Sequence, residues 1–235
     1  MRSQRGRPLA ASGTETAERI RQAAMKLFHV NGFVTSTVRE IAEACDLTPG
    51  AIYNHFGSKH EILYSIVKWS HDELEREVAE AIAAAPDGAR EKLRAALVAF
   101  TRRHTLFPEA ARVTNRDYRF LPEPSRSEVI GLRRKLRALI QRLVQDGIDE
   151  GVMALPALDP GRRGRHLAAE IVAMDLINMS VMVAEWYRPN GPLSSQSISE
   201  FQADVALQMV TTEGRGAQPA RPNGNRYTKS KSRGS

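Results

Sequence analysis

The chain has one cysteine, Cys45, among its 235 residues. A single thiol cannot form a disulfide within the chain, and a reducing cytoplasm fits this composition. The first residues, MRSQRGRPLAASG, are basic but lack the apolar segment of a secretory signal. The most apolar stretch, residues 171–184, contains Asp175 and Asn178 and is expected to be too short and polar to span a bilayer. We therefore expect a cytoplasmic protein with no membrane partner.

Catalytic and metal-binding patterns are also missing from the sequence. It contains no Ser/His/Asp arrangement, no glycine-rich phosphate loop and no HExxH motif, and its six histidines lack metal-ligand spacing. Cys45 follows a helical apolar pattern, where a small buried side chain is expected rather than a nucleophile. The sequence therefore predicts no enzyme, no metal site and no cofactor. Strand alternation and internal repeats are missing too, which predicts an all-α fold.

The formal net charge of +7 invites a nucleic-acid interpretation, but its distribution matters more. Residues 1–13 carry three arginines and no acid, and residues 213–235 carry six basic residues against one acid. The remainder of the chain is close to neutral. We expect a disordered basic arm at 1–13 and a disordered basic tail at 213–235.

Two short helical patterns stand in residues 35–59, TSTVREIAEACDLTPGAIYNHFGSK. The first follows the hydroxyl caps Ser36 and Thr37, and the second begins with the cap Thr48 and with Pro49 at its first helical position. Ile52 and Phe56 share the inward face of the second helix, which is expected to span 49–55. This spacing is typical of a helix-turn-helix, whose second helix lies in the major groove of DNA.

A preceding helix, expected over 14–30, completes a three-helix DNA-binding domain at 14–60. The alternative is that these helices only pack a core. That alternative does not explain why Tyr53, Asn54 and His55 gather on the outer face. We therefore favour DNA binding by this face.

The segments AERIRQAAMKLFHVNGF and TSTVREIAEACDLTPGAIYNHFGSKHEIL resemble the TetR family of bacterial transcriptional regulators. The resemblance implies a homodimer that binds a palindromic double-stranded operator, represses transcription and is released by an effector. It also implies an N-terminal arm that follows the minor groove. The residues expected to contact DNA are Ser36, Thr37, Thr48, Pro49, Gly50, Ala51, Tyr53, Asn54, His55, Lys59, Arg5 and Arg7.

Helical patterns continue through residues 61–212 and bring the expected total to about nine helices. The resemblance makes this part a domain for effector binding and dimerisation, linked to the DNA-binding domain by a long helix at 58–85. Its last two long helices are implied to form a four-helix dimer interface. The residues expected in that interface are Ile171, Met182, Trp186, Tyr187, Phe201 and Val205.

Basic residues are concentrated at 101–142, with eleven Lys or Arg and four acids. One interpretation is a solvated basic face. The other is the mouth of a cavity for an anionic effector, because arginine forks match phosphate oxygens. The residues expected to bind the effector are Arg116, Arg119, Phe120, Arg126, Arg133, Arg137, Met174, Ile177, Asn178 and Val181.

A second resemblance concerns the segments NRDYRFLPEPSRSEVIGLRRKLRALIQRLVQDGIDEGVM and AEWYRPNGPLSSQSISEF. They look like the C-terminal domain of TetR-type regulators of fatty-acid and sterol catabolism, which implies an acyl-CoA or steroid-CoA effector. Two alternatives stay open. The chain could regulate multidrug efflux or other genes and sense an uncharged or cationic hydrophobe, or it could bind ligands without a DNA function.

Overall fold

The computed structural model describes residues 13–156 and 162–210. Within these ranges the chain forms nine α-helices and one short 3₁₀-helix and has no strand, which confirms the all-α prediction. The expected arm and tail lie outside the described residues, except that Gly13 is the first residue of the first helix.

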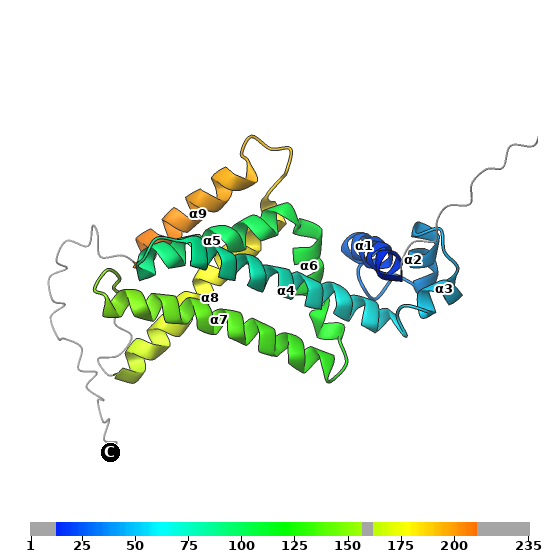
Figure 1. Ribbon diagram of the computed structural model, residues 1–235, viewed down its shortest axis with the longest axis horizontal. Helices are drawn as coiled ribbons and strands as arrows, with labels where there is room; N and C mark the ends of the chain where they lie inside the picture. Colours follow the sequence, from blue (N-terminus) through cyan, green and yellow to red (C-terminus); the bar gives the residue numbers. More distant parts are fainter. Residues whose placement is uncertain (1–12, 157–161, 211–235) are drawn as a thin grey trace, which may run out of the picture.

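Three helices gather at one end of the molecule (Figure 1): α1 (Gly13–Asn31), α2 (Val38–Ala44) and α3 (Pro49–Tyr53). Gly32 ends α1 with a φ of 84°, a left-handed conformation that glycine adopts without strain. The Gly32 N–H donates to the Phe28 carbonyl at 2.9 Å and closes the last turn.

The predicted caps of the helix pair are present. Thr37 and Glu40 form a reciprocal capping box at the start of α2, and the Thr48 hydroxyl accepts from the Ala51 N–H at the start of α3. Asp46 makes the turn between them with a φ of 54°. Helix α3 ends at Tyr53, two residues before the predicted end, because the His55 N–H donates to Ile52 rather than continuing the α-helical pattern.

The long helix α4 (Lys59–Ala84) starts directly after the helix pair and runs through the rest of the molecule (Figure 1). Ser58 caps it by accepting from the Glu61 N–H at 3.1 Å. Its first half joins the N-terminal core, whose fully buried side chains include Phe28, Ile41 and Ile52. Its second half belongs to another core, so α4 connects the two parts mechanically.

The second core is built on α4 by the remaining long helices. They are α5 (Ala89–Leu106), α7 (Ser125–Asp149), α8 (Arg162–Trp186) and α9 (Ser195–Val210). Between α5 and α7 lie the short helix α6 (Pro108–Asp117) and the 3₁₀-helix η1 (Tyr118–Phe120). Helix α6 packs against α1 and α4 as well as α8, so it touches both parts of the molecule.

Candidate functional site

Helix α3 turns outward the side chains that the sequence predicts for DNA contact. Thr48, Pro49, Gly50, Tyr53 and Asn54 are exposed, and Ala51 and His55 are half-buried. Ile52 is fully buried and anchors the helix to α1 and α2. A short helix held this way can enter a major groove. Arg5 and Arg7 lie outside the described residues, so their role stays a prediction.

The two threonines predicted for DNA contact act as helix caps. The Thr37 hydroxyl donates to Glu40 Oε2 at 2.8 Å, and its oxygen accepts from the Glu40 N–H at 3.2 Å. These bonds hold the pKa of the Glu40 carboxyl below its usual range. Both Thr37 and Thr48 are exposed, so capping leaves them on the surface that carries α3.

Ser36 does not have the role that the sequence predicts. Its side chain is buried, and its hydroxyl donates to the Gly32 carbonyl at 2.8 Å and reaches the Leu27 carbonyl at 3.3 Å. The hydroxyl therefore fixes the loop between α1 and α2, and the prediction that it binds phosphate is corrected.

Lys59 also bonds within the protein at the helix pair. Its ammonium donates to three carbonyls of the α1–α2 loop, those of Phe33 at 2.8 Å, Val34 at 3.3 Å and Ser36 at 2.7 Å. The nitrogen also lies 4.5 Å from the centre of the Phe33 ring. All three N–H groups are used within the protein, so Lys59 clamps the loop to α4, and its contact with DNA stays a prediction.

A cavity of about 420 Å³ lies in the second part of the molecule. Helices α4, α5, α6, α7 and α8 all contribute to its wall. The lining residues are Ser70, His71, Leu74, Glu75, Phe100, His104, Ala111, Thr114, Asn115, Leu132, Arg133, Lys135, Leu136, Arg137, Ala138, Leu139, Arg142, Met174, Ile177, Asn178 and Val181. Its size and largely apolar lining suit a small organic ligand.

The cavity has a buried end and an exposed mouth. Leu74, Phe100, His104, Ala111 and Thr114 are buried and mark the inner end. At the other end, the exposed lining residues include two cations, Lys135 and Arg142, on α7. A ligand that fills the cavity would therefore place its apolar part inside and its anionic part at the mouth.

Two histidines stand at the inner end. His104 Nδ1 lies 2.8 Å from the Phe100 carbonyl, which can only accept, so this nitrogen carries the proton. Burial lowers the pKa of His104 to about 4. Burial, with the nearby charge of Arg133, also lowers the pKa of His71 to about 4. Both rings are uncharged at neutral pH and can take part in hydrogen bonds without bringing a charge.

Six of the ten residues predicted for the effector line this cavity: Arg133, Arg137, Met174, Ile177, Asn178 and Val181. Arg133 lies deeper than predicted, because its guanidinium is 3.9 Å from the centre of the Tyr118 ring and donates to the Thr114 carbonyl at 2.9 Å. Arg137, with Lys135 and Arg142, supplies the positive charge nearer the mouth.

The other four predicted effector residues lie elsewhere. Arg116 pairs with Asp117 at 2.8 Å and donates to the Phe28 carbonyl at 2.5 Å, so it ties α6 to α1. Arg119 donates to the Arg116 carbonyl, and Arg126 pairs with Glu123. Phe120 stacks on Phe33 with ring centres 5.6 Å apart. The prediction for these four residues is wrong because each has a partner away from the cavity.

Sequence reasoning missed His71, Phe100, His104 and Thr114. In a helical pattern each reads as an ordinary core residue, and no local signal shows that several helices leave space between them.

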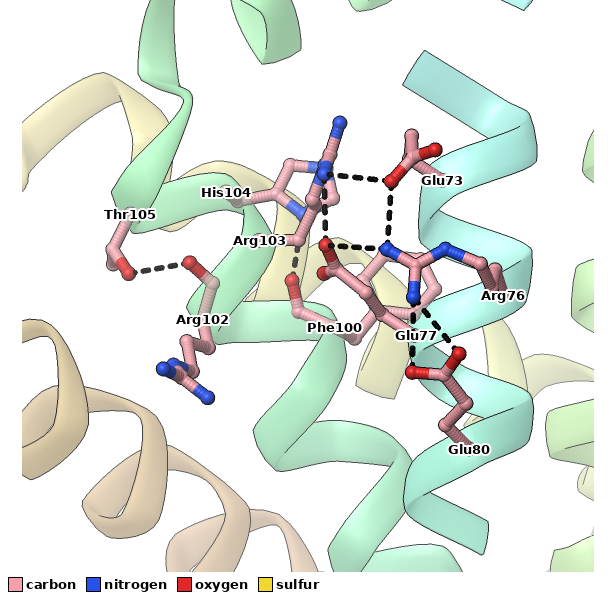
Figure 2. A network of polar contacts seen from close by, with 9 residues as sticks. All are labelled: Glu73, Arg76, Glu77, Glu80, Phe100, Arg102, Arg103, His104 and Thr105. Carbon is pink, nitrogen blue, oxygen red and sulfur yellow. Dashed lines mark hydrogen bonds and ion pairs between the residues drawn. The ribbon is translucent and has the colours of Figure 1, made fainter. Parts of the chain in front are cut away.

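Beside the cavity, a network of charged side chains joins α5 to α4 (Figure 2). Arg103 follows Phe100 on α5 and lies 2.8 Å from Glu77 on α4. Its guanidinium carbon is 4.8 Å from the Trp69 ring centre and 4.3 Å from the Phe107 ring centre. On α4, Arg76 bridges Glu73 at 2.7 Å and Glu80 at 2.8 Å. The neighbour of Arg103, His104, lines the cavity, so this network connects the cavity wall with the linking helix.

Exposed apolar side chains lie on α8 and α9, where the dimer interface is expected. Met182 is 53% exposed, Trp186 51% and Phe201 66%, and Ile171 is exposed on the same helix as Met182. Val205 is half-buried. Tyr187 is instead buried against Val183 and Ile198 within the subunit, which corrects its placement in the interface.

Helix α8 also bears on the membrane question. Over His166–Trp186 it is long and apolar enough to cross a bilayer by length and composition, which corrects the expectation that it is too short. Some 39% of its most apolar window is buried inside the molecule. Its exposed apolar face is the one expected to meet a second subunit.

Two family models match the chain. One is described as bacterial regulatory proteins of the tetR family and matches residues 20–66. The other is described as the tetracyclin repressor-like C-terminal domain and matches residues 86–210, more than half of the chain. Together they span both parts of the fold.

Full-length relatives agree with these matches. The chain is 24% identical to the HTH-type transcriptional repressor KstR2 of Mycobacterium tuberculosis over 196 residues, which covers 82% of this chain and 92% of the relative. The crystal structure of a tetR-family regulatory protein from Rhodococcus RHA1 is 26% identical, with a TM-score of 0.71, and covers 84% of this chain and 97% of that one. AibR, solved with isovaleryl coenzyme A and operator DNA, shares the fold at 20% identity and a TM-score of 0.65, covering 83% and 97%.

Proposed function

Because the chain belongs to the TetR family of bacterial regulators, we propose that it represses transcription at a palindromic operator and is released by a coenzyme A thioester from lipid breakdown. Members of this family are DNA-binding transcriptional regulators that act as dimers and are not enzymes. The regulatory role therefore follows from the family, and the effector and operator type are the proposal.

Operator binding is assigned to α3. Its outward residues Tyr53 and Asn54, with the exposed caps at Thr37 and Thr48, form the surface that meets DNA. In a dimer, two such helices about 34 Å apart would reach successive major grooves. A two-fold dimer matches a palindromic site for the same reason.

The observation that carries the effector proposal is an apolar cavity with a cationic mouth. Arg137, Lys135 and Arg142 stand on α7 at or near that mouth, and only Lys135 has a carboxylate partner, Glu75, among the described residues. Arginine forks bind phosphate oxygens. The volume suits the acyl part of a thioester, with the phosphate-bearing head outside.

Two relatives support this ligand class. KstR2 of Mycobacterium tuberculosis is described as a ketosteroid transcriptional regulator, and AibR was solved with isovaleryl coenzyme A. Both share the fold of this chain. The thioester bound to AibR and the ketosteroid in the description of KstR2 are consistent with an acyl or steroid-derived thioester for this cavity.

Release would act through α4. Ser70, His71, Leu74 and Glu75 of this helix line the cavity, and the same helix begins at Lys59, next to the helix pair. A ligand that favours one position of α4 shifts the population of dimers away from the spacing that fits the operator. The size of the shift depends on the difference in ligand affinity between the two states.

Operator binding is tested by a gel-shift with the DNA upstream of the chain's own gene. A specific complex is expected that competes poorly with unrelated DNA. Failure to bind any such fragment would favour a ligand-binding protein without a DNA function.

The effector class is tested by titrating acyl-CoA and the matching free acid against the protein–DNA complex. The thioester should release DNA at much lower concentration. Arg137→Ala with Arg142→Ala should raise the required thioester concentration about a hundredfold, because charge-assisted bonds contribute about 1.5–3 kcal/mol each.

The matched control is Arg126→Ala with Arg134→Ala, which removes two charges from the same helix outside the cavity. It should respond like the unaltered protein. Equal potency of thioester and free acid would point to an uncharged or cationic hydrophobe. Mass spectrometry of ligand that co-purifies with the protein would then identify it.

A further inference from the structure

Three buried polar atoms on the cavity wall have no hydrogen-bond partner in the described part of the chain. They are His71 Nε2 on α4, Thr114 Oγ1 on α6 and Arg133 Nε on α7. Thr114 is only 3% exposed. Buried polar groups in proteins are nearly always bonded, so three on one cavity wall require an explanation.

These atoms belong to residues that line the same cavity. Arg133 Nη2 donates to the Thr114 carbonyl at 2.9 Å and to Asn115 Oδ1 at 3.2 Å, which places the guanidinium beside Thr114. The charge of Arg133 also acts on His71, and both residues line the same cavity as Thr114 and His104. The inner end of the cavity therefore brings polar groups from α4, α5, α6 and α7 together.

We propose that His71 and Thr114 form a subsite for an uncharged hydroxyl or keto oxygen at the far end of the effector's acyl group. This inference rests on the proposed function, because the thioester end would lie at the cationic mouth. The effector would then be an oxygen-bearing acyl thioester, and a plain saturated chain would leave the subsite unsatisfied.

The groups around the subsite favour an uncharged oxygen. His71 and Thr114 are neutral, and Arg133 already directs Nη2 to two protein oxygens, so only its Nε is buried without a partner among the described residues. A buried carboxylate needs a full set of donors to offset its lost hydration, whereas a hydroxyl or ketone needs one or two. The imidazole and the threonine hydroxyl can each donate or accept, so they suit either neutral oxygen.

The subsite would also give the ligand a polar contact on the linking helix. His71 belongs to α4, while Thr114 belongs to α6, which packs against α1 of the DNA-binding part. An oxygen held between them would join the two helices that approach the DNA-binding domain. A saturated chain can fill the same space but cannot make this bridge.

The test uses calorimetric titration of the full-length protein with octanoyl-, decanoyl- and dodecanoyl-coenzyme A. Each thioester is compared with its derivative that carries a hydroxyl on the terminal carbon. At the chain length that reaches the inner end, the hydroxyl derivative should bind about tenfold more tightly, the effect of one well-formed hydrogen bond.

Thr114→Val keeps the shape of the side chain and removes its hydroxyl, and His71→Phe removes the ring nitrogens. Each should abolish the preference for the hydroxyl derivative, so that the hydroxylated and the saturated thioester bind to the variant equally within about twofold. Thr114→Ser should retain the preference, which separates loss of the hydroxyl from loss of folding.

Thr101→Val is the matched control. Thr101 is fully buried on α5 and its hydroxyl also has no partner among the described residues, but it does not line the cavity. This variant should keep the full preference.

Thioesters that bind with no preference for the hydroxyl at any length would overturn the subsite and leave the proposed effector class standing. The same conclusion follows if Thr101→Val removes the preference as completely as Thr114→Val. If no thioester binds, the proposed effector class is wrong and the subsite falls with it.

Discussion

The helix pair and the cavity differ in how their polar side chains are satisfied. At the helix pair, Ser36, Thr37, Thr48 and Lys59 all bond to groups within the same short stretch of chain. In the cavity, three polar atoms have no partner among the described residues. The side chains that cap and brace the helix pair are bonded within the protein, whereas the cavity presents groups that a ligand can complete.

This difference fits the two tasks. A surface that reads DNA gains specificity when its geometry is fixed in advance, because little ordering is needed on binding. A sensor must instead respond to its ligand, so the ligand has to bind one conformation of the protein more tightly than the other. Substitutions in each region test whether the helix pair is fixed in advance and the cavity responds to a ligand.

The largest loss of stability is expected from a substitution at Arg103, which joins α5 to α4 beside the cavity. Arg103→Ala removes the partner of Glu77 and the contacts with the Trp69 and Phe107 rings, and it should lower the free energy of unfolding by about 3–5 kcal/mol. Urea unfolding of the full-length protein measures this loss. The neighbouring Arg102→Ala, at an exposed position, should change it by less than about 0.5 kcal/mol. Equal stability of the two variants would mean that the network contributes nothing.

Lys59→Ala should have the next largest effect, on the stability of the DNA-binding part. It removes three bonds from an ammonium to loop carbonyls and should cost about 2–3 kcal/mol, because part of the group is open to solvent. Thermal unfolding measures it, with the exposed Arg39→Ala as control.

The salt dependence of operator binding separates a clamp from a phosphate ligand at Lys59. If Lys59 is a clamp, the variant binds DNA more weakly but its slope of log affinity against log salt stays the same. A slope reduced by about 0.9 would mean that Lys59 contacts a phosphate after all.

A smaller effect for each residue is expected from acid. His71 and His104 have pKa values lowered to about 4, whereas an unfolded histidine titrates near 6.5. The unfolded chain therefore binds more protons below pH 6.5, and stability is lost as pH falls from about 6.5 toward 4. At pH 5 the loss should be roughly 2 kcal/mol for each histidine.

His104→Phe isolates one contribution to this acid effect. Unfolding of the variant and the unaltered protein is compared at pH 7 and pH 5. The variant should lose less stability than the unaltered protein over this interval. Identical losses would show that His104 is charged or exposed in the folded state.

The fold could be predicted largely from the sequence because its signals are local. The caps Thr37 and Thr48, the proline at position 49 and the spacing of Ile41 and Ile52 lie within a few residues of the structure they specify. The helix pair was therefore placed to within two residues. The same view misjudged Ser36, whose hydroxyl turns back to Gly32 and Leu27, and missed the clamp at Lys59, whose partners lie 23 to 26 residues earlier in the chain.

The cavity could be predicted only in part, because it depends on how five helices pack. The sequence shows that α7 is rich in basic side chains, and Arg133 and Arg137 do line the cavity wall. The sequence does not show which side of the folded domain each arginine occupies, so the prediction that Arg116 and Arg126 line the effector site is wrong. His71 and Thr114 carry no local signal, since their significance arises from each other's position.

The smallest effect is expected at Tyr53, the most direct test of the DNA-reading surface. Its side chain is 54% exposed on α3, where its hydroxyl can meet the DNA that the sequence predicts Tyr53 to contact. Tyr53→Phe removes that hydroxyl and no charge, so operator affinity should fall roughly fivefold, the effect of one hydrogen bond of about 1 kcal/mol. The salt slope should not change, because a neutral donor displaces no counterion.

The same variant distinguishes phosphate from base contact. A phosphate contact carries no sequence information, so the loss should be the same on the operator and on altered sites. A loss confined to the intact operator would mean that Tyr53 reads a base edge. Tyr118→Phe, on η1 outside the helix pair, removes an equivalent hydroxyl and should leave affinity unchanged. Full affinity in Tyr53→Phe would remove this hydroxyl from the DNA-binding surface and leave contact to its ring or to neighbours such as Asn54.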